Sequence, residues 1–143
     1  MLRTVAIVAA IAVSATAVYA QSAAIGQRKE AFKAMAGAAK APGAMIKGEA
    51  PFALPAVQTA LKAFQDESGK LKSLFPDDSK TGDTNVLPVA FEKRADLTAR
   101  FDKLAADAKA AVGAIKDEAS FKTEWPKVVS NCGGCHKEYR KPN

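Results

Sequence analysis

Apolar residues in this 143-residue chain recur at gaps of three and four, and no segment shows the strict alternation of a half-buried strand. Such spacing places the apolar side chains of a segment on one face of a helix. Four apolar stripes can be traced in this way, at residues 25–46, 57–75, 97–115 and 121–139, and the third has an alternative start near residue 91. The chain is therefore predicted to be all-α, with four helices that each bury one face.

Prolines, glycines and polar residues separate the four stripes. Residues 41–43 (Ala-Pro-Gly) are expected to end or kink the first helix, and residues 48–55 separate it from the second. The longest polar stretch, residues 76–88, is interpreted as the loop before the third helix, and Ser120 as the N-cap of the fourth. Two short connections and one longer loop favour an antiparallel up-and-down four-helix bundle.

The first twenty residues have the pattern of a secretory signal peptide. Arg3 precedes an apolar run at residues 5–13, which is too short to span a membrane, and small residues lead up to Ala20. We therefore expect a signal peptide at residues 1–20, a bundle domain at residues 21–143, and an exported, periplasmic protein without stable membrane insertion. The formal net charge is +6, but basic and acidic residues alternate along the chain, so no nucleic-acid partner is expected.

Both cysteines and the single histidine of the chain lie within five consecutive positions, from Cys132 to His136. On a helix, residues 132, 135 and 136 lie at about 0°, 300° and 40°, so both sulfurs and the imidazole project from one side. Cys132 and Cys135 also continue the apolar stripe of the fourth helix, and this side therefore faces the core. Cys-x-x-Cys-His is the pattern of covalent haem attachment, in which two thioethers hold the macrocycle and the histidine coordinates iron. The sequence thus predicts one haem c with His136 as an axial ligand.

Other uses of these three residues agree less well with the sequence. A structural zinc site needs four nitrogen or sulfur ligands, and the chain offers three. A thioredoxin-like dithiol lies at a helix N-terminus after a strand, whereas this pair lies near the end of a predicted helix. A disulfide between residues three apart closes only a short loop. A haem-free exported thiol or metal-handling protein is kept as the alternative from a different class.

The residues alone do not determine what occupies the second axial position of the iron. After residue 20 the methionines are Met35 and Met45, and Phe32 lies at the centre of the first stripe. Phenylalanine cannot coordinate iron, so Phe32 over the haem would leave five-coordinate iron, whereas Met35 would complete a six-coordinate His/Met pair. Arg28 lies in the same stripe, where its guanidinium would either pair with a haem propionate or extend to solvent at the bundle edge.

Two stretches of the sequence resemble a known family. The attachment motif lies near the C-terminus, in NCGGCHKEYR at residues 131–140, and the first helix contains QRKEAFKAM at residues 27–35. In these features the chain resembles the class II c-type cytochromes, that is, the cytochromes c′ and their low-spin relatives, and the resemblance covers residues 21–143. It implies a four-helix bundle and one covalent haem c, tethered by Cys132 and Cys135 and coordinated by His136 on the proximal side.

The resemblance also implies roles for the other candidate residues. Arg28 matches a first-helix arginine near a propionate, and Phe32 matches the distal position. Tyr139 and Arg140 match an aromatic-basic pair whose basic member lies near the proximal face. A distal Phe is the cytochrome c′ pattern, with high-spin iron that is open to NO or CO. Low-spin relatives carry a ligating Met there, and Met35, one turn away, would provide the six-coordinate alternative.

These expectations combine into one function. We expect a periplasmic monohaem cytochrome that transfers electrons, binds NO or CO, or does both, and that is not an enzyme. Its partners would be redox proteins of the periplasm, with NO or CO as small ligands. Many members of the family form dimers through their first two helices, so a homodimer is compatible with the resemblance.

Overall fold

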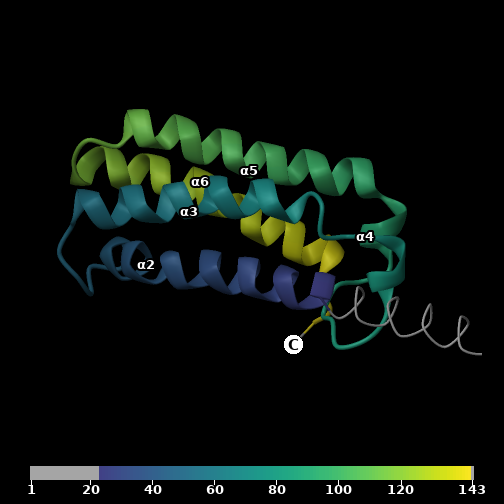
Figure 1. Ribbon diagram of the computed structural model, residues 1–143. Helices are drawn as coiled ribbons and strands as arrows, with labels where there is room; N and C mark the ends of the chain where they lie inside the picture. The colour runs from purple at the N-terminus through teal and green to yellow at the C-terminus, as the bar shows by residue number, and fades with distance from the viewer. Residues whose placement is uncertain (1–22, 143) are drawn as a thin grey trace, which may run out of the picture.

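Long helices run side by side and in alternating directions through the computed structural model, which describes residues 23–142 (Figure 1). Residues 23–38 are helical and continue, after one turn residue at position 39, into α2. The elements that follow are α2 Lys40–Ile46, α3 Leu54–Leu71, η1 Asp77–Lys80, α4 Val89–Glu92, α5 Arg94–Ala114 and α6 Glu118–Tyr139. The predicted all-α, antiparallel four-helix bundle is confirmed, and residues 23–46 form its first, bent helix.

The predicted signal peptide, residues 1–20, lies outside the described residues. The division of the chain into residues 1–20 and 21–143 therefore stays a prediction. Within residues 23–142, no helix combines the length and the apolar character that a membrane crossing needs.

The first helix bends near its proline but does not end there. Pro42 has no amide hydrogen with which to reach the carbonyl of residue 38, and the regular helix is interrupted at residue 39. The amide of Ala39 still donates to the carbonyl of Met35 at 3.0 Å, and the amide of Gly43 donates to Ala39 at 2.9 Å. Of the two outcomes expected for residues 41–43, the structure therefore shows the kink.

A capping box starts α6, one turn earlier than the sequence suggested. The amide of Ser120 donates to the Asp117 carboxylate at 2.8 Å, and the amide of Asp117 donates to the Ser120 hydroxyl at 3.1 Å. Asp117 has the extended backbone of a cap, and Ser120 is the third helical residue. The prediction of Ser120 as N-cap was therefore wrong. Asp117 is the N-cap, and the Ser120 hydroxyl accepts a hydrogen bond from the Asp117 amide.

The hydrophobic core is divided into two clusters along the bundle. One holds Leu61, Phe64 and Trp125 among others, from the middle and early parts of α3 and α6. The other holds Leu71, Phe75 and other residues near the α4 end of the bundle. Met35, which is half-buried, packs against both clusters. The first helix therefore spans the junction between them.

The segment before α4 pairs with the residues that follow α6. Val86 and Arg140 form an isolated antiparallel bridge. On either side of it, the amide of Leu87 donates to the carbonyl of Tyr139 at 2.9 Å, and the amide of Lys141 donates to Asn85 at 2.8 Å. The loop therefore fixes the end of the helix that carries both cysteines and the histidine.

The capping box makes a prediction about pH. Hydrogen bonds from Ser120 hold the pKa of the Asp117 carboxyl below its usual value, so the charged form stabilises the fold. This contribution is complete above about pH 4, the pKa of an unfolded aspartate, and is lost as the pH falls through the lower folded value. Asp117→Asn should therefore lower the Tm of the protein at pH 7, and its difference from wild type should shrink below about pH 4. Equal Tm values at pH 7 would contradict this role.

Candidate cofactor site

A cavity of about 510 Å³ lies at the junction of the two core clusters. Its lining includes side chains from the first helix, α3, the long loop, α5 and α6. Every candidate residue from the sequence lines this one cavity: Arg28, Phe32, Met35, Cys132, Cys135, His136, Tyr139 and Arg140. Met45, the other methionine considered, is buried in one of the core clusters and is not among the lining residues.

The last turns of α6 bring the two thiols and the imidazole to the cavity. Cys132 and Cys135 are free, half-buried cysteines, and burial raises the pKa of both thiols. Partial burial, followed by the positive charge of Arg140, lowers the pKa of His136. This shift favours the neutral imidazole, which is the form that coordinates a metal ion. Within residues 23–142, no group of three or more His, Cys, Asp or Glu side chains could hold a metal ion.

Phe32 and Met35 approach the cavity from the first helix. Both are half-buried. The Phe32 ring packs in the cluster near α4, with its centroid 6.4 Å from that of Phe101 on α5. Both residues line the same space one turn apart, so their positions are compatible with either distal group.

Arg28 is the most deeply buried charged residue of the described chain, at 1% exposure. Its Nη1 donates to the carbonyl of Leu74 at 2.9 Å and to the hydroxyl of Ser79 at 3.0 Å. Its Nη2 donates to the carbonyl of Ser79 and to the hydroxyl of Thr84, both at 3.2 Å. Burial lowers the pKa of the guanidinium, and four neutral oxygens compensate for the lost water. The alternative in which Arg28 extends to solvent is therefore wrong, while its bond to a propionate stays a prediction.

Aromatic rings complete the surroundings of the Arg28 guanidinium. Its central carbon lies 4.8 Å from the ring centroid of Phe75 and 5.6 Å from that of Phe91. At these distances the ring faces attract the cation. Arg28 thus connects the first helix, the loop and the start of α4 at the end of the cavity.

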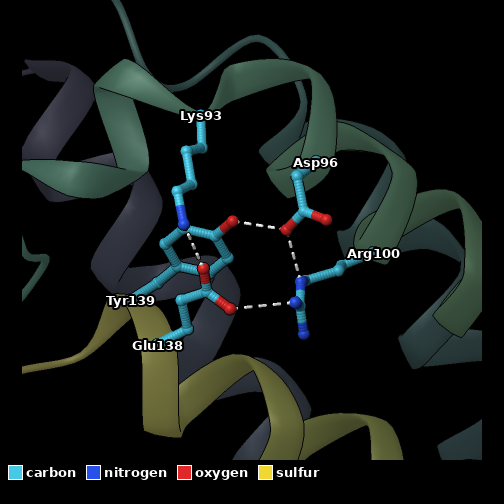
Figure 2. A network of polar contacts seen from close by, with 5 residues as sticks. All are labelled: Lys93, Asp96, Arg100, Glu138 and Tyr139. Atoms are coloured by element: carbon cyan, nitrogen blue, oxygen red, sulfur yellow. Dashed lines mark hydrogen bonds and ion pairs between the residues drawn. The ribbon is translucent and has the colours of Figure 1, made fainter.

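A polar network that sequence reasoning missed lies beside the attachment segment (Figure 2). The hydroxyl of Tyr139 donates to Asp96, and Nε of Arg100 donates to the same carboxylate at 2.6 Å. Glu138 accepts from Arg100 at 3.0 Å and from Lys93 at 2.8 Å. Burial and the bond to Asp96 raise the pKa of Tyr139 to about 12, so its hydroxyl stays protonated as a donor.

Arg100 is the functional candidate in this network, because it also lines the cavity. A Cβ added at Gly134 would lie 3.7 Å from Nη1 of Arg100, which places the guanidinium against the attachment segment. Its spacing of four from Asp96 was a signal in the sequence, since such pairs meet on one helix face. That spacing could not show whether the pair would lie beside the cavity or on the outer surface of the bundle.

The charged residues that line the cavity are all basic. They are Arg28, Lys29, Lys33, Arg100 and Arg140, and no Asp or Glu among the described residues lines it. A cleft lined by one sign of charge attracts the opposite sign. Two thiols, a neutral imidazole, mostly apolar walls and basic residues therefore fit a large apolar group that carries carboxylates, as haem does.

Comparison with known proteins identifies the family. The sequence model described as Cytochrome C′ matches residues 23–140. The chain belongs to the cytochrome c′ family. Proteins of this family bind one covalent haem c with iron, and the residues around the cavity fit that group. The predicted family, fold and cofactor are confirmed, whereas the roles of single residues stay predictions.

Individual relatives agree with this assignment. Cytochrome c′ of Rhodopseudomonas palustris is 50% identical over 122 residues, which cover 85% of this chain and 84% of that protein. Cytochrome c-556 of the same organism is 32% identical over 148 residues, covering 98% and 97%. The solved structure of cytochrome c′ from R. palustris superposes with a TM-score of 0.82 at 49% identity, over 84% of this chain and 97% of that one.

The burial of Arg28 leads to a prediction about stability. Arg28→Met would leave the oxygens of Leu74, Ser79 and Thr84 without their donor. The free energy of unfolding of the haem-loaded protein should fall by about 2–3 kcal/mol, as measured by urea denaturation. As a control, Lys62→Met on the exposed face of α3 removes a surface pair with Asp66 and should change stability by less than about 0.5 kcal/mol. Similar losses in the two variants would contradict the role of Arg28.

Proposed function

We propose that this chain is a periplasmic monohaem cytochrome that transfers single electrons and binds NO or CO, with five-coordinate iron at rest. The observation that carries the proposal is that every residue singled out by the sequence lines one cavity of about 510 Å³. Membership of the cytochrome c′ family supports a haem carrier or gas-binding protein rather than an enzyme.

The residues of α6 would hold the haem. Cys132 and Cys135 would form the two thioethers, and His136 would supply the proximal nitrogen from the next position of the helix. When bound, the haem supplies one-electron redox chemistry and an axial position for a small ligand. Arg140 would act on the proximal side, and Arg28 would lie near a propionate. Tyr139, held by Asp96, would keep the end of α6 in place.

Phe32 would cover the distal side. Its side chain offers no donor atom, and the neighbouring ring of Phe101 limits where it can move. A bulky apolar side chain in this position leaves room for a diatomic molecule but not for a larger ligand. The higher identity to a cytochrome c′, 50%, than to a cytochrome c-556, 32%, agrees with this assignment.

A second candidate is a six-coordinate electron carrier that uses His136 and Met35. It is favoured by one observation, that Met35 lines the same cavity as Phe32 and lies one turn further along the first helix. Iron with two protein ligands transfers electrons without forming or breaking a bond. Such a protein would bind CO or NO only if Met35 were displaced.

Location and partners follow from the proposed export. Residues 1–20 would direct the chain to the periplasm, where its redox partners would be proteins of the same compartment. A homodimer through the first two helices stays a prediction from the family resemblance.

Haem attachment is tested by mass. The chain expressed with a haem-ligation pathway should gain the mass of one haem, and the double variant Cys132→Ala, Cys135→Ala should gain none. Any haem that His136→Ala carries should have altered optical bands, because the iron would have lost its proximal nitrogen. A wild-type chain without added haem mass would favour the haem-free thiol or metal-handling alternative.

The distal assignment is tested by spin state. Ferric wild-type protein should be high-spin in optical and EPR spectra, and Met35→Leu should leave those spectra unchanged. Phe32→Met should convert the iron to a low-spin form, because it places a thioether where the ring lies. A low-spin wild type whose methionine charge-transfer band disappears in Met35→Leu would overturn the assignment in favour of the six-coordinate carrier.

A further inference from the structure

We propose that a second, smaller pocket is the access site through which uncharged diatomic molecules reach the distal side of the haem. This access pocket has a volume of about 200 Å³ and lies between the end of α3 and the start of α5. Exposed Ser73 and half-buried Thr98 line its outer part. The inference rests on the proposed gas-binding function, and it identifies the path by which NO or CO enters the protein.

The access pocket and the main cavity share three lining residues, Phe75, Leu97 and Phe101. We call these residues the shared wall. Their exposures are 6%, 4% and 4%, so the wall is closed to solvent in the structure. Because each side chain borders both spaces, the wall is one side chain thick. A small molecule in the access pocket is therefore separated from the main cavity by a single layer of apolar groups.

The shared wall leads to the proposed distal residue. Phe101 contacts Phe75 on one side, with ring centroids 5.8 Å apart, and Phe32 on the other, at 6.4 Å. A molecule that passes the wall therefore arrives beside the Phe32 ring. The cysteines and His136 are absent from the lining of the access pocket, and the contact between Phe101 and Phe32 assigns the route to the Phe32 side of the main cavity.

Leu97 is the member of the wall most able to move aside. Phe75 is held on three sides, by the guanidinium of Arg28 at 4.8 Å and by the rings of Phe91 and Phe101, each at 5.8 Å. Leu97 has no ring to be held by such contacts, and side chains in a packed core do change rotamer. Transient rotation of Leu97 would open the wall to a molecule of two atoms without moving a helix.

The cations at the access pocket are paired, which suits uncharged molecules. Lys72 donates to Asp102 at 2.8 Å, and Arg94 forms an ion pair with Asp77. The main cavity is likewise lined only by basic charged residues, some of which are also paired, such as Arg100 with Asp96. NO and CO carry no charge, so they gain nothing from that basic lining and can enter wherever the apolar barrier is thinnest.

The first test measures CO binding to the ferrous haem-loaded protein by flash photolysis and ligand replacement. Leu97→Ala should raise both the association and the dissociation rate constants by about tenfold relative to the control variant Leu104→Ala. A change in the route alters the barrier in both directions, whereas a change in the haem pocket alters the affinity. Leu104→Ala is the matched control, since Leu104 is also buried on α5 and lines the main cavity but not the access pocket.

A second variant closes the route from outside without altering the core. Ser73→Trp, at an exposed position, should fill the access pocket and lower both rate constants by about tenfold, with an unchanged ratio. Wild-type rate constants in both Ser73→Trp and Leu97→Ala would overturn the proposal. Equal acceleration in Leu97→Ala and Leu104→Ala would also overturn it, because general loosening of the core would then explain the effect.

A third measurement does not depend on ligand binding at iron. Crystals of the haem-loaded protein pressurised with xenon should show xenon against Phe75, Leu97 and Phe101, and Ser73→Trp should abolish this site. Absence of xenon there in the wild type would overturn the access site even if CO binds. If no CO binds to any variant, the gas-binding function fails separately, and the xenon result still decides whether the pocket takes apolar molecules.

Discussion

The cavity between the two core clusters is the constraint on which the rest of the structure depends. A space of about 510 Å³ with mostly apolar walls separates the first helix from α5 and α6, and exposed residues such as His136 border it. Without an occupant, water would contact apolar side chains that a filled site would bury, at about 25 cal/mol for each Å² exposed. A large apolar group in this space removes that cost, and haem c is the group that the family binds.

The helices and the position of the attachment motif could be predicted because they rest on local patterns. Gaps of three and four between apolar residues specify a buried helix face, and the spacing of Cys132, Cys135 and His136 specifies one side of it. The partners of Arg28 could not be predicted in this way. They lie 46 to 56 positions away, in a loop whose path depends on how the helices pack. The cap of α6 was misplaced by one turn because Asp117 and Ser120 can each accept from an amide.

The distal group illustrates a different limit. Phe32 and Met35 lie one turn apart on a helix face that borders the cavity, and each is half-buried. Periodicity cannot separate two residues that share a face, and burial does not separate them either. Coordination chemistry distinguishes them, since only a thioether can bind iron. Spectroscopy of the iron therefore gives information that neither the helical pattern nor the fold contains.

The antiparallel bridge that follows α6 joins this segment to the long loop before α4. Besides its amide bond to Asn85, Lys141 donates through its side chain to the Thr84 carbonyl at 2.9 Å, and the Thr84 hydroxyl accepts from Arg28. The segment after α6 and the buried arginine of the first helix therefore hold the same stretch of loop. A change that loosens one of these two attachments should also loosen the other, so the two ends of the bundle sequence act together at the cavity.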